Sequence, residues 1–187
     1  MSDALLDVTV ESIAAGGDGV ARSSGLVVFL PRTAPGDHGR VRVQLRGRLA
    51  RGEMVALERP SDRRVEPPCA HYTRDRCGGC QLQHLRYDAQ LDAKRGIVRD
   101  SLQRIARREV DVPAVAASDR EWRYRRKLTL ALRRRGGRWI GGLHPYDAPG
   151  RVFELDDCPI TDERVIDAWR QILQASSLLP DSTTELR

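Results

Sequence analysis

The sequence predicts a mainly β protein with α elements: a small OB-type β-barrel, followed by an α+β domain that carries clustered cysteines and a basic β-unit. Three observations predict this class. Residues 1–60 contain five short apolar stretches separated by glycine-rich turns, which is typical of small closed barrels. One amphipathic stretch follows at 85–108, and a strand–turn–strand pattern follows at 121–158. No βαβ series of the Rossmann type is present in this chain, and GGDGVA at 16–21 lacks the third glycine of a dinucleotide-binding loop.

The barrel strands are predicted from their turns. The five stretches are LDVTVESI, GVAR, GLVVFLP, GRVRVQL and EMVALERP, and VRVQL alternates apolar and polar residues as a half-buried strand does. Turn signals divide them at 16–19, 23–25 and 34–37. We therefore predict a barrel over residues 1–60, although another small β-domain also fits the pattern.

The rest of the chain is predicted to form one central domain, 61–187, in two parts. Residues 61–110 hold a polar linker, the cysteines and a helix over 85–108, and residues 111–187 hold the basic β-unit and a helix over 161–175. Thr161 is expected to cap that last helix. The chain ends at TTELR, where we expect no packed element. The expected inward residues of the two helices are Tyr87, Leu91, Val98, Leu102 and Ile105, and then Val165, Trp169 and Ile172.

The charge balance favours a polyanionic partner. Lys and Arg total 32 against 26 Asp and Glu, which gives a net charge of +6. The N-terminus lacks the pattern of a signal peptide, and no apolar run reaches the length of a membrane span. We therefore expect a cytoplasmic protein with reduced thiols, which disfavours pairing its four cysteines as disulfides.

The cysteines have the spacing of a metal site. Cys69, Cys77 and Cys80 lie within twelve residues, and Cys158 follows far downstream. The C-x2-C pair places two sulfurs on one turn, where Gly78 and Gly79 remove bulk and permit positive φ. Four thiolates suit either an iron–sulfur cluster or zinc, and the spacing alone leaves both open.

Cys158 decides how far the site reaches along the chain. As a ligand, it would join the 69–80 loop to the end of the β-unit and close a long loop. As a nucleophile it is disfavoured, because the neighbouring Asp156 and Asp157 would raise its pKa. His71 and His84 are interpreted as ordinary packed or surface histidines rather than ligands.

A basic stretch with interleaved aromatic residues lies in the β-unit at 120–139. Guanidinium groups bind phosphates, and aromatic rings stack on unpaired bases, so the stretch suits single-stranded or looped RNA. A solvated strand edge is the alternative. The predicted RNA-binding residues are Arg123, Tyr124, Arg125, Arg126, Lys127, Arg133, Arg134, Arg135 and Arg138.

These motifs together resemble the N-terminal part of the TRAM-domain RNA uracil-C5 methyltransferases, which make 5-methyluridine in rRNA or tRNA. The matching stretches run from about 10 to 165 and include ESIAAGGDGVAR, RRVEPPCAHY, CGGCQLQHLRYDAQLDAKRGIV, WRYRRKLTLAL and DDCPIT. The spacing between the first two cysteines differs: seven residues separate them here, where the family usually has five.

The resemblance implies a role for each part. It makes the barrel an RNA-binding TRAM domain, and makes Cys69, Cys77, Cys80 and Cys158 the ligands of a [4Fe–4S] cluster. The family's S-adenosylmethionine-binding catalytic domain follows this region, so we expect a fragment without catalytic residues whose partner is rRNA or tRNA. No membrane or protein partner is expected. The alternatives are a stand-alone RNA-binding zinc module and a small electron carrier.

Overall fold

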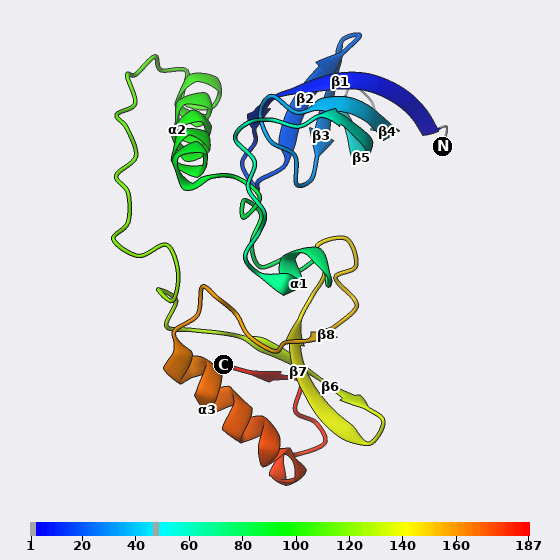
Figure 1. Cartoon of the computed structure of the whole chain (residues 1–187), viewed down its shortest axis with the longest axis vertical. Helices are drawn as coiled ribbons and strands as arrows, with labels where there is room; N and C mark the ends of the chain where they lie inside the picture. The colour runs from blue at the N-terminus through cyan, green and yellow to red at the C-terminus, as the bar shows by residue number, and fades with distance from the viewer. Residues whose placement is uncertain (1–2, 47–48) are drawn as a thin grey trace. The chain divides into compact units, whose positions relative to one another are not determined.

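The computed structural model describes residues 3–46 and 49–187, which form two compact units (Figure 1). The barrel unit comprises Met1–Pro67 and Gln81–Ala117, and the cysteine unit comprises Pro68–Cys80 and Ser118–Arg187. This division differs from the predicted boundaries, because the helix that follows the cysteines groups with the barrel. Among the described residues, no helix is both long and apolar enough to cross a bilayer.

The barrel unit contains a closed five-stranded barrel, as predicted. Its strand order is β1-β2-β3-β5-β4, with β3 and β5 parallel and the other neighbours antiparallel. Alternate apolar side chains fill the interior, among them Val10, Val28, Leu30, Val41 and Val43. The strands are β1 Asp3–Ile13, β2 Gly19–Ser23, β3 Leu26–Leu30, β4 His38–Arg46 and β5 Leu49–Arg59.

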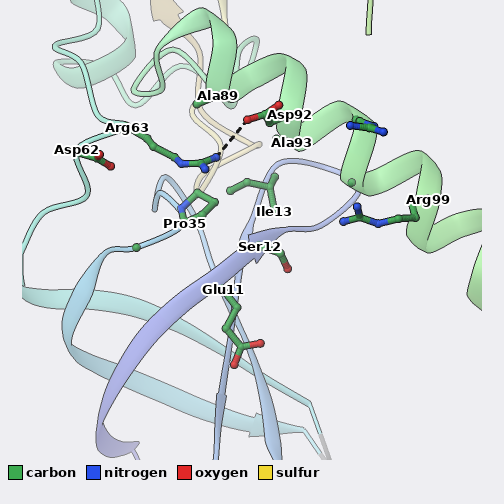
Figure 2. A pocket seen from close by; sticks show the side chains of 13 residues that line it. Glu11, Ser12, Ile13, Pro35, Asp62, Arg63, Ala89, Asp92, Ala93 and Arg99 are labelled. Carbon is green, nitrogen blue, oxygen red and sulfur yellow. Dashed lines mark ion pairs between the residues drawn. The ribbon is translucent and has the colours of Figure 1, made fainter. Parts of the chain in front are cut away.

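Helix α2, Tyr87–Arg104, packs on this barrel through a narrow face of small residues. Ala89 is buried, and Ala93 and Ile97 pack in the same cluster as Ile13 of β1. Ala89, Ala93 and Ile13 also line the pocket that Figure 2 shows. The predicted inward stripe is therefore wrong, since Val98 is 46% exposed and Ile105 is 83% exposed. The predicted stripe was chosen for large apolar residues, whereas small ones allow the helix to approach the barrel closely.

A buried carboxylate fixes the linker to the barrel. Asp37 is fully buried and accepts hydrogen bonds from the backbone N–H of Ala34 at 2.6 Å and of Ser61 at 2.9 Å. Arg64 completes a bidentate pair at 2.8 and 2.6 Å. Burial acts to raise the pKa of Asp37, but these donors outweigh it, so the pKa of the carboxyl is lowered. The 61–64 segment is thus part of the barrel unit.

His84 makes the barrel unit sensitive to mild acid. It is buried beside the Thr33 carbonyl, 3.1 Å from its Nε2, and burial lowers its pKa from about 6.5 to about 4. Between these values the unfolded chain binds a proton that the folded chain excludes. Stability is therefore complete above pH 6.5 and falls as the pH drops toward 4. We expect the barrel unit to lose ~2 kcal/mol between pH 7.5 and 5.

The His84 effect is measurable by urea-dependent hydrogen exchange of barrel peptides, corrected for intrinsic rates at each pH. Tryptophan fluorescence does not serve, because Trp122, Trp139 and Trp169 all lie in the cysteine unit. His84→Gln keeps a donor for the Thr33 carbonyl and should flatten the response over this range. An equal loss in the variant would assign the acid sensitivity to other groups.

The cysteine unit is built on a four-stranded sheet with order β8-β7-β6-β9. Gly136 and Gly137 have φ of 57° and 80°, which forms the predicted tight hairpin between β6 and β7. Leu128, Leu130 and Leu132 point into the core, as their alternation predicted. The elements are α1 Ala70–Thr73, β6 Leu130–Arg135, β7 Arg138–Leu143, β8 Phe153–Glu154, α3 Glu163–Gln174, a 3-10 turn Ser176–Leu178 and β9 Glu185–Leu186.

Three local expectations for this unit are wrong. Asp162 caps α3 by accepting from the Arg164 N–H, while Thr161 is fully buried. Ile172 is 42% exposed, and Ile166 faces the core instead. The C-terminal residues do pack, because β9 pairs with β6.

Candidate metal centre and nucleic-acid surface

The structure brings all four cysteines into one compact unit. All four are free thiols; Cys69, Cys77 and Cys158 are buried and Cys80 is partly buried. Cys77 and Cys158 share a hydrophobic cluster with Leu155, and Cys80 packs against it. Cys158 follows β8 in a non-strand segment, so the last strand of the β-unit predicted over 121–158 ends earlier, at Glu154.

Backbone pairing holds the C-x2-C loop against the connection that follows β7. The N–H of Gly78 donates to the His144 carbonyl at 2.9 Å, and the N–H of Tyr146 donates to the Arg76 carbonyl at 2.9 Å. A Cβ on Gly78 would lie 3.1 Å from the His144 oxygen. The positive φ expected at Gly78 and Gly79 is not observed, since Arg76 has that conformation (φ 54°). Gly78 is needed for close approach instead.

His71 connects the cysteine loop to the segment that carries Cys158. Its ring is 4% exposed, lies 5.2 Å from the Phe153 ring, and accepts a hydrogen bond at Nε2 from the Asp156 N–H at 3.0 Å. Nδ1 donates to Asp75 at 2.6 Å. Burial acts to raise the pKa of Asp75, but the bonds from His71 and Arg74 lower it overall. The histidine is packed, as predicted; its bridging role had no signal in the sequence.

Arg123 holds the other side of the Cys158 segment. Its guanidinium forms a bidentate pair with Asp157 at 2.9 and 2.8 Å and donates to the Cys158 carbonyl at 3.1 Å. The backbone N–H groups of Arg123 and Arg125 also donate to the carbonyls of Pro159 and Ile160, both at 2.8 Å. The basic stretch and the Cys158 segment are therefore hydrogen-bonded side by side.

The sulfur chemistry of the site fits a cationic centre. Burial raises the pKa of Cys77 to about 11, and the nearby Cys80, Cys69 and Cys158 add to this shift, while an N–H of Gly79 3.4 Å from the sulfur opposes it. Three buried thiols and one partly buried thiol that act on one another electrostatically would repel as thiolates, and a metal centre relieves that repulsion. Within the described residues, no three His, Cys, Asp or Glu side chains are arranged to hold a metal ion. The four cysteines therefore suit a metal centre through the chemistry of their donor atoms and through their place in one unit.

The predicted RNA-binding residues divide into two groups. Tyr124, Arg125, Arg126 and Lys127 are exposed, and none of these side chains makes an ion pair among the described residues. Arg138 is different, because it forms a bidentate pair with Glu154 at 2.7 Å.

The remaining members have partners within the cysteine unit. Arg134 pairs with Asp181 and lies over the Trp139 ring at 4.7 Å, and Arg133 and Arg135 donate to backbone carbonyls. Trp139 is buried, so it does not offer a stacking surface. Arg133, Arg134, Arg135 and Arg138 are exposed as well, so what distinguishes 124–127 is that their side chains have no hydrogen-bond or ion-pair partner among the described residues.

The chain is similar to proteins named RNA methyltransferases over most of its length. It is 33% identical over 172 residues to an uncharacterized RNA methyltransferase of Listeria monocytogenes serovar 1/2a, covering 90% of this chain and 37% of the relative. It is 37% identical over 152 residues to one from Protochlamydia amoebophila (81% and 34%) and 35% identical over 188 residues to one from Thermosynechococcus vestitus (97% and 41%). No family model matches.

These similarities confirm the resemblance to RNA methyltransferases drawn from the motifs. The chain spans about two fifths of the length of these relatives or less. The match therefore relates the chain to one part of such proteins.

Proposed function

We propose that the chain is the RNA-binding and [4Fe–4S]-binding portion of an S-adenosylmethionine-dependent RNA (uracil-C5) methyltransferase that acts on rRNA. The observation that carries the proposal is the pairing of the Cys158 segment with the basic stretch 123–125 in the same unit as the other three cysteines. The residues that carry out methyl transfer and bind S-adenosylmethionine lie outside this chain.

Each part of the cysteine unit has a role in this proposal. Cys69, Cys77, Cys80 and Cys158 would hold the cluster, which supplies a structural cross-link when bound. His71 and Arg123 hold the Cys158 segment by protein contacts alone. Tyr124, Arg125, Arg126 and Lys127 present a stacking ring and cations to single-stranded RNA.

RNA affinity should depend steeply on salt. Replacing Arg125, Arg126 and Lys127 with Gln removes three exposed cations, so we expect at least a tenfold loss of affinity at low salt. The slope of log K against log salt should become shallower by ~2, at roughly 0.7 per phosphate contact on a single strand. Filter binding of a fluorescent single-stranded rRNA fragment from 50 to 300 mM salt gives both quantities.

A matched pair of single variants separates the loss of an arginine in this stretch from the loss of any exposed positive charge. Arg126→Gln should weaken binding, whereas Arg151→Gln, which removes an exposed arginine of the same unit outside the stretch, should not. A flat salt response of the unaltered chain would contradict RNA binding by this surface.

The methylated base is testable in cells. Deleting the gene should remove 5-methyluridine at one position of rRNA, and mass spectrometry of rRNA nucleosides and fragments measures it. Unchanged 5-methyluridine, with loss of another modification, would overturn the uracil-C5 assignment and leave the RNA-binding role standing. A protein that binds one zinc and affects no modification would instead be an RNA-binding zinc module.

A further inference from the structure

Two hydrogen-bond donors of the cysteine unit are buried without an acceptor. Neither the hydroxyl of Thr161 nor the indole N–H of Trp169 makes a hydrogen bond with any residue that the structure describes. Thr161 is fully buried and Trp169 is 8% exposed, and both polar atoms are closed to bulk water. Buried donors in native proteins nearly always have a partner, because an unpaired one is costly. The two donors therefore call for an acceptor other than the described residues.

Both donors lie beside the segment that carries Cys158. Thr161 closes a turn on this segment, since its N–H donates to the Cys158 carbonyl at 2.8 Å. Trp169 is on the buried face of α3 and belongs to the same hydrophobic cluster as Cys158. Its neighbour Arg170 donates to the Asp156 carbonyl at 2.7 Å, which ties α3 to the residues just before Cys158. Protein contacts alone thus hold both donors in the neighbourhood of the cysteines.

Metal-bound sulfur is the acceptor that this neighbourhood suits. A neutral thiol accepts hydrogen bonds only weakly, whereas a metal-bound thiolate or a sulfide ion carries negative charge and accepts strongly. The N–H of Gly79 already lies 3.4 Å from the sulfur of Cys77. Most of the other side chains in the hydrophobic cluster are apolar, among them Leu155, Ile160 and Ile166, and these offer no competing acceptor.

We propose that the Thr161 hydroxyl and the Trp169 indole N–H donate hydrogen bonds to the sulfur atoms of the [4Fe–4S] cluster. The inference rests on the proposed function, because it assumes that the four cysteines hold this cluster. Both are positioning residues, which contact sulfur and ligate no iron. Hydrogen bonds of this kind favour the reduced cluster, whose sulfurs carry more negative charge, and so raise its reduction potential.

Thr161→Val and Trp169→Phe remove the two donors while keeping most of the packing. Resonance Raman spectroscopy of the oxidised cluster measures the Fe–S stretching bands, and the bands of hydrogen-bonded sulfurs shift when exchangeable protons are replaced by deuterium. We expect this deuterium shift to be smaller in each variant than in the unaltered chain, and smallest in the double variant. The N–H of Gly79 is retained in all of them, so part of the shift should remain.

The reduction potential is the second measurement. The double variant should favour the oxidised cluster about tenfold more at a given potential, which corresponds to a midpoint ~59 mV more negative for a one-electron couple. An anaerobic titration with dithionite, followed by visible absorption, gives the midpoint. A purely structural role of the two residues would change stability without moving the midpoint.

Trp139→Phe is the matched control. Trp139 has the same buried, unpaired indole N–H in the same unit, but it lies outside the hydrophobic cluster that contains Cys158. Its loss should leave the deuterium shift and the midpoint unchanged. Benzothienylalanine introduced at position 169 replaces the N–H by sulfur in a ring of nearly the same shape. This form keeps the test valid if Trp169→Phe loses iron through poorer packing.

The outcomes separate this proposal from the proposed function. If the double variant keeps its iron, with the deuterium shift and the midpoint of the unaltered chain, the two donors do not bond to sulfur and the proposed function stands. An equal change in Trp139→Phe and Trp169→Phe would also overturn the proposal, because it would assign the effect to packing. If the unaltered chain holds no [4Fe–4S] cluster, the proposed function fails and this proposal fails with it.

Discussion

Cys158→Ser is expected to reduce the iron content of anaerobically purified protein from about four atoms per chain to less than one. Serine occupies nearly the same space as cysteine, but its hydroxyl is neither soft nor readily ionised and so binds iron poorly. The backbone contacts of residue 158 with Arg123 do not involve the sulfur, so the segment should keep its place. Iron analysis and the visible absorption of the cluster measure the loss.

Asp156→Asn is the matched control for this substitution. The Asp156 side chain is 69% exposed; it pairs with Arg74 at 3.0 Å and lies 3.8 Å from His71 Nε2. The hydrogen bond to His71 comes from the backbone N–H, which the variant retains. It should keep its iron. Full iron content in Cys158→Ser would show that another residue supplies the fourth ligand, and the link between the metal and the basic stretch would be lost.

Asp37→Ala is expected to destabilise the barrel unit by ~3–5 kcal/mol, the usual result of removing one partner of a buried ion pair. The change leaves Arg64 without its carboxylate and leaves the N–H groups of Ala34 and Ser61 without acceptors. Urea-dependent hydrogen exchange of barrel peptides measures the effect. Because the folded pKa of Asp37 is lowered, its contribution is present above the unfolded value of about 3.8 and lost as the pH falls below it.

Asp18→Ala provides the comparison for Asp37→Ala. Asp18 pairs at 3.0 Å with Arg51, whose side chain is 66% exposed, and such surface pairs contribute little. We expect a change of less than ~1 kcal/mol. Equal effects of the two substitutions would mean that the Asp37 contacts do not anchor the linker.

The barrel was predictable because the residues that determine its strands and turns lie close together in the sequence. Alternating side chains set the strands, and Gly25 has the positive φ that its tight turn requires, as Gly136 and Gly137 do in the hairpin of the cysteine unit. The convergence of the cysteines in one unit followed from spacing and resemblance. The relation to RNA methyltransferases followed from motifs such as CGGCQLQH and is supported over most of the chain.

The rest depended on contacts between distant segments. Nothing near His71 indicates that its ring would accept a bond from Asp156, 85 residues away. The basic stretch predicts that Arg123 contacts nucleic acid. In the structure its guanidinium instead donates hydrogen bonds to Asp157 and to the Cys158 carbonyl. The packed face of α2 was predicted wrongly because periodicity gives most weight to large apolar residues. The close approach of the helix to the barrel instead requires small residues, here Ala89 and Ala93.

The most direct test of the account is the metal content of the unaltered chain, purified without oxygen. Iron, acid-labile sulfide and zinc are measured per chain on the same sample, together with the visible and Mössbauer spectra. We predict about four irons and four sulfides, as a [4Fe–4S] cluster held by Cys69, Cys77, Cys80 and Cys158 requires. A colourless protein with one zinc and no sulfide would contradict it.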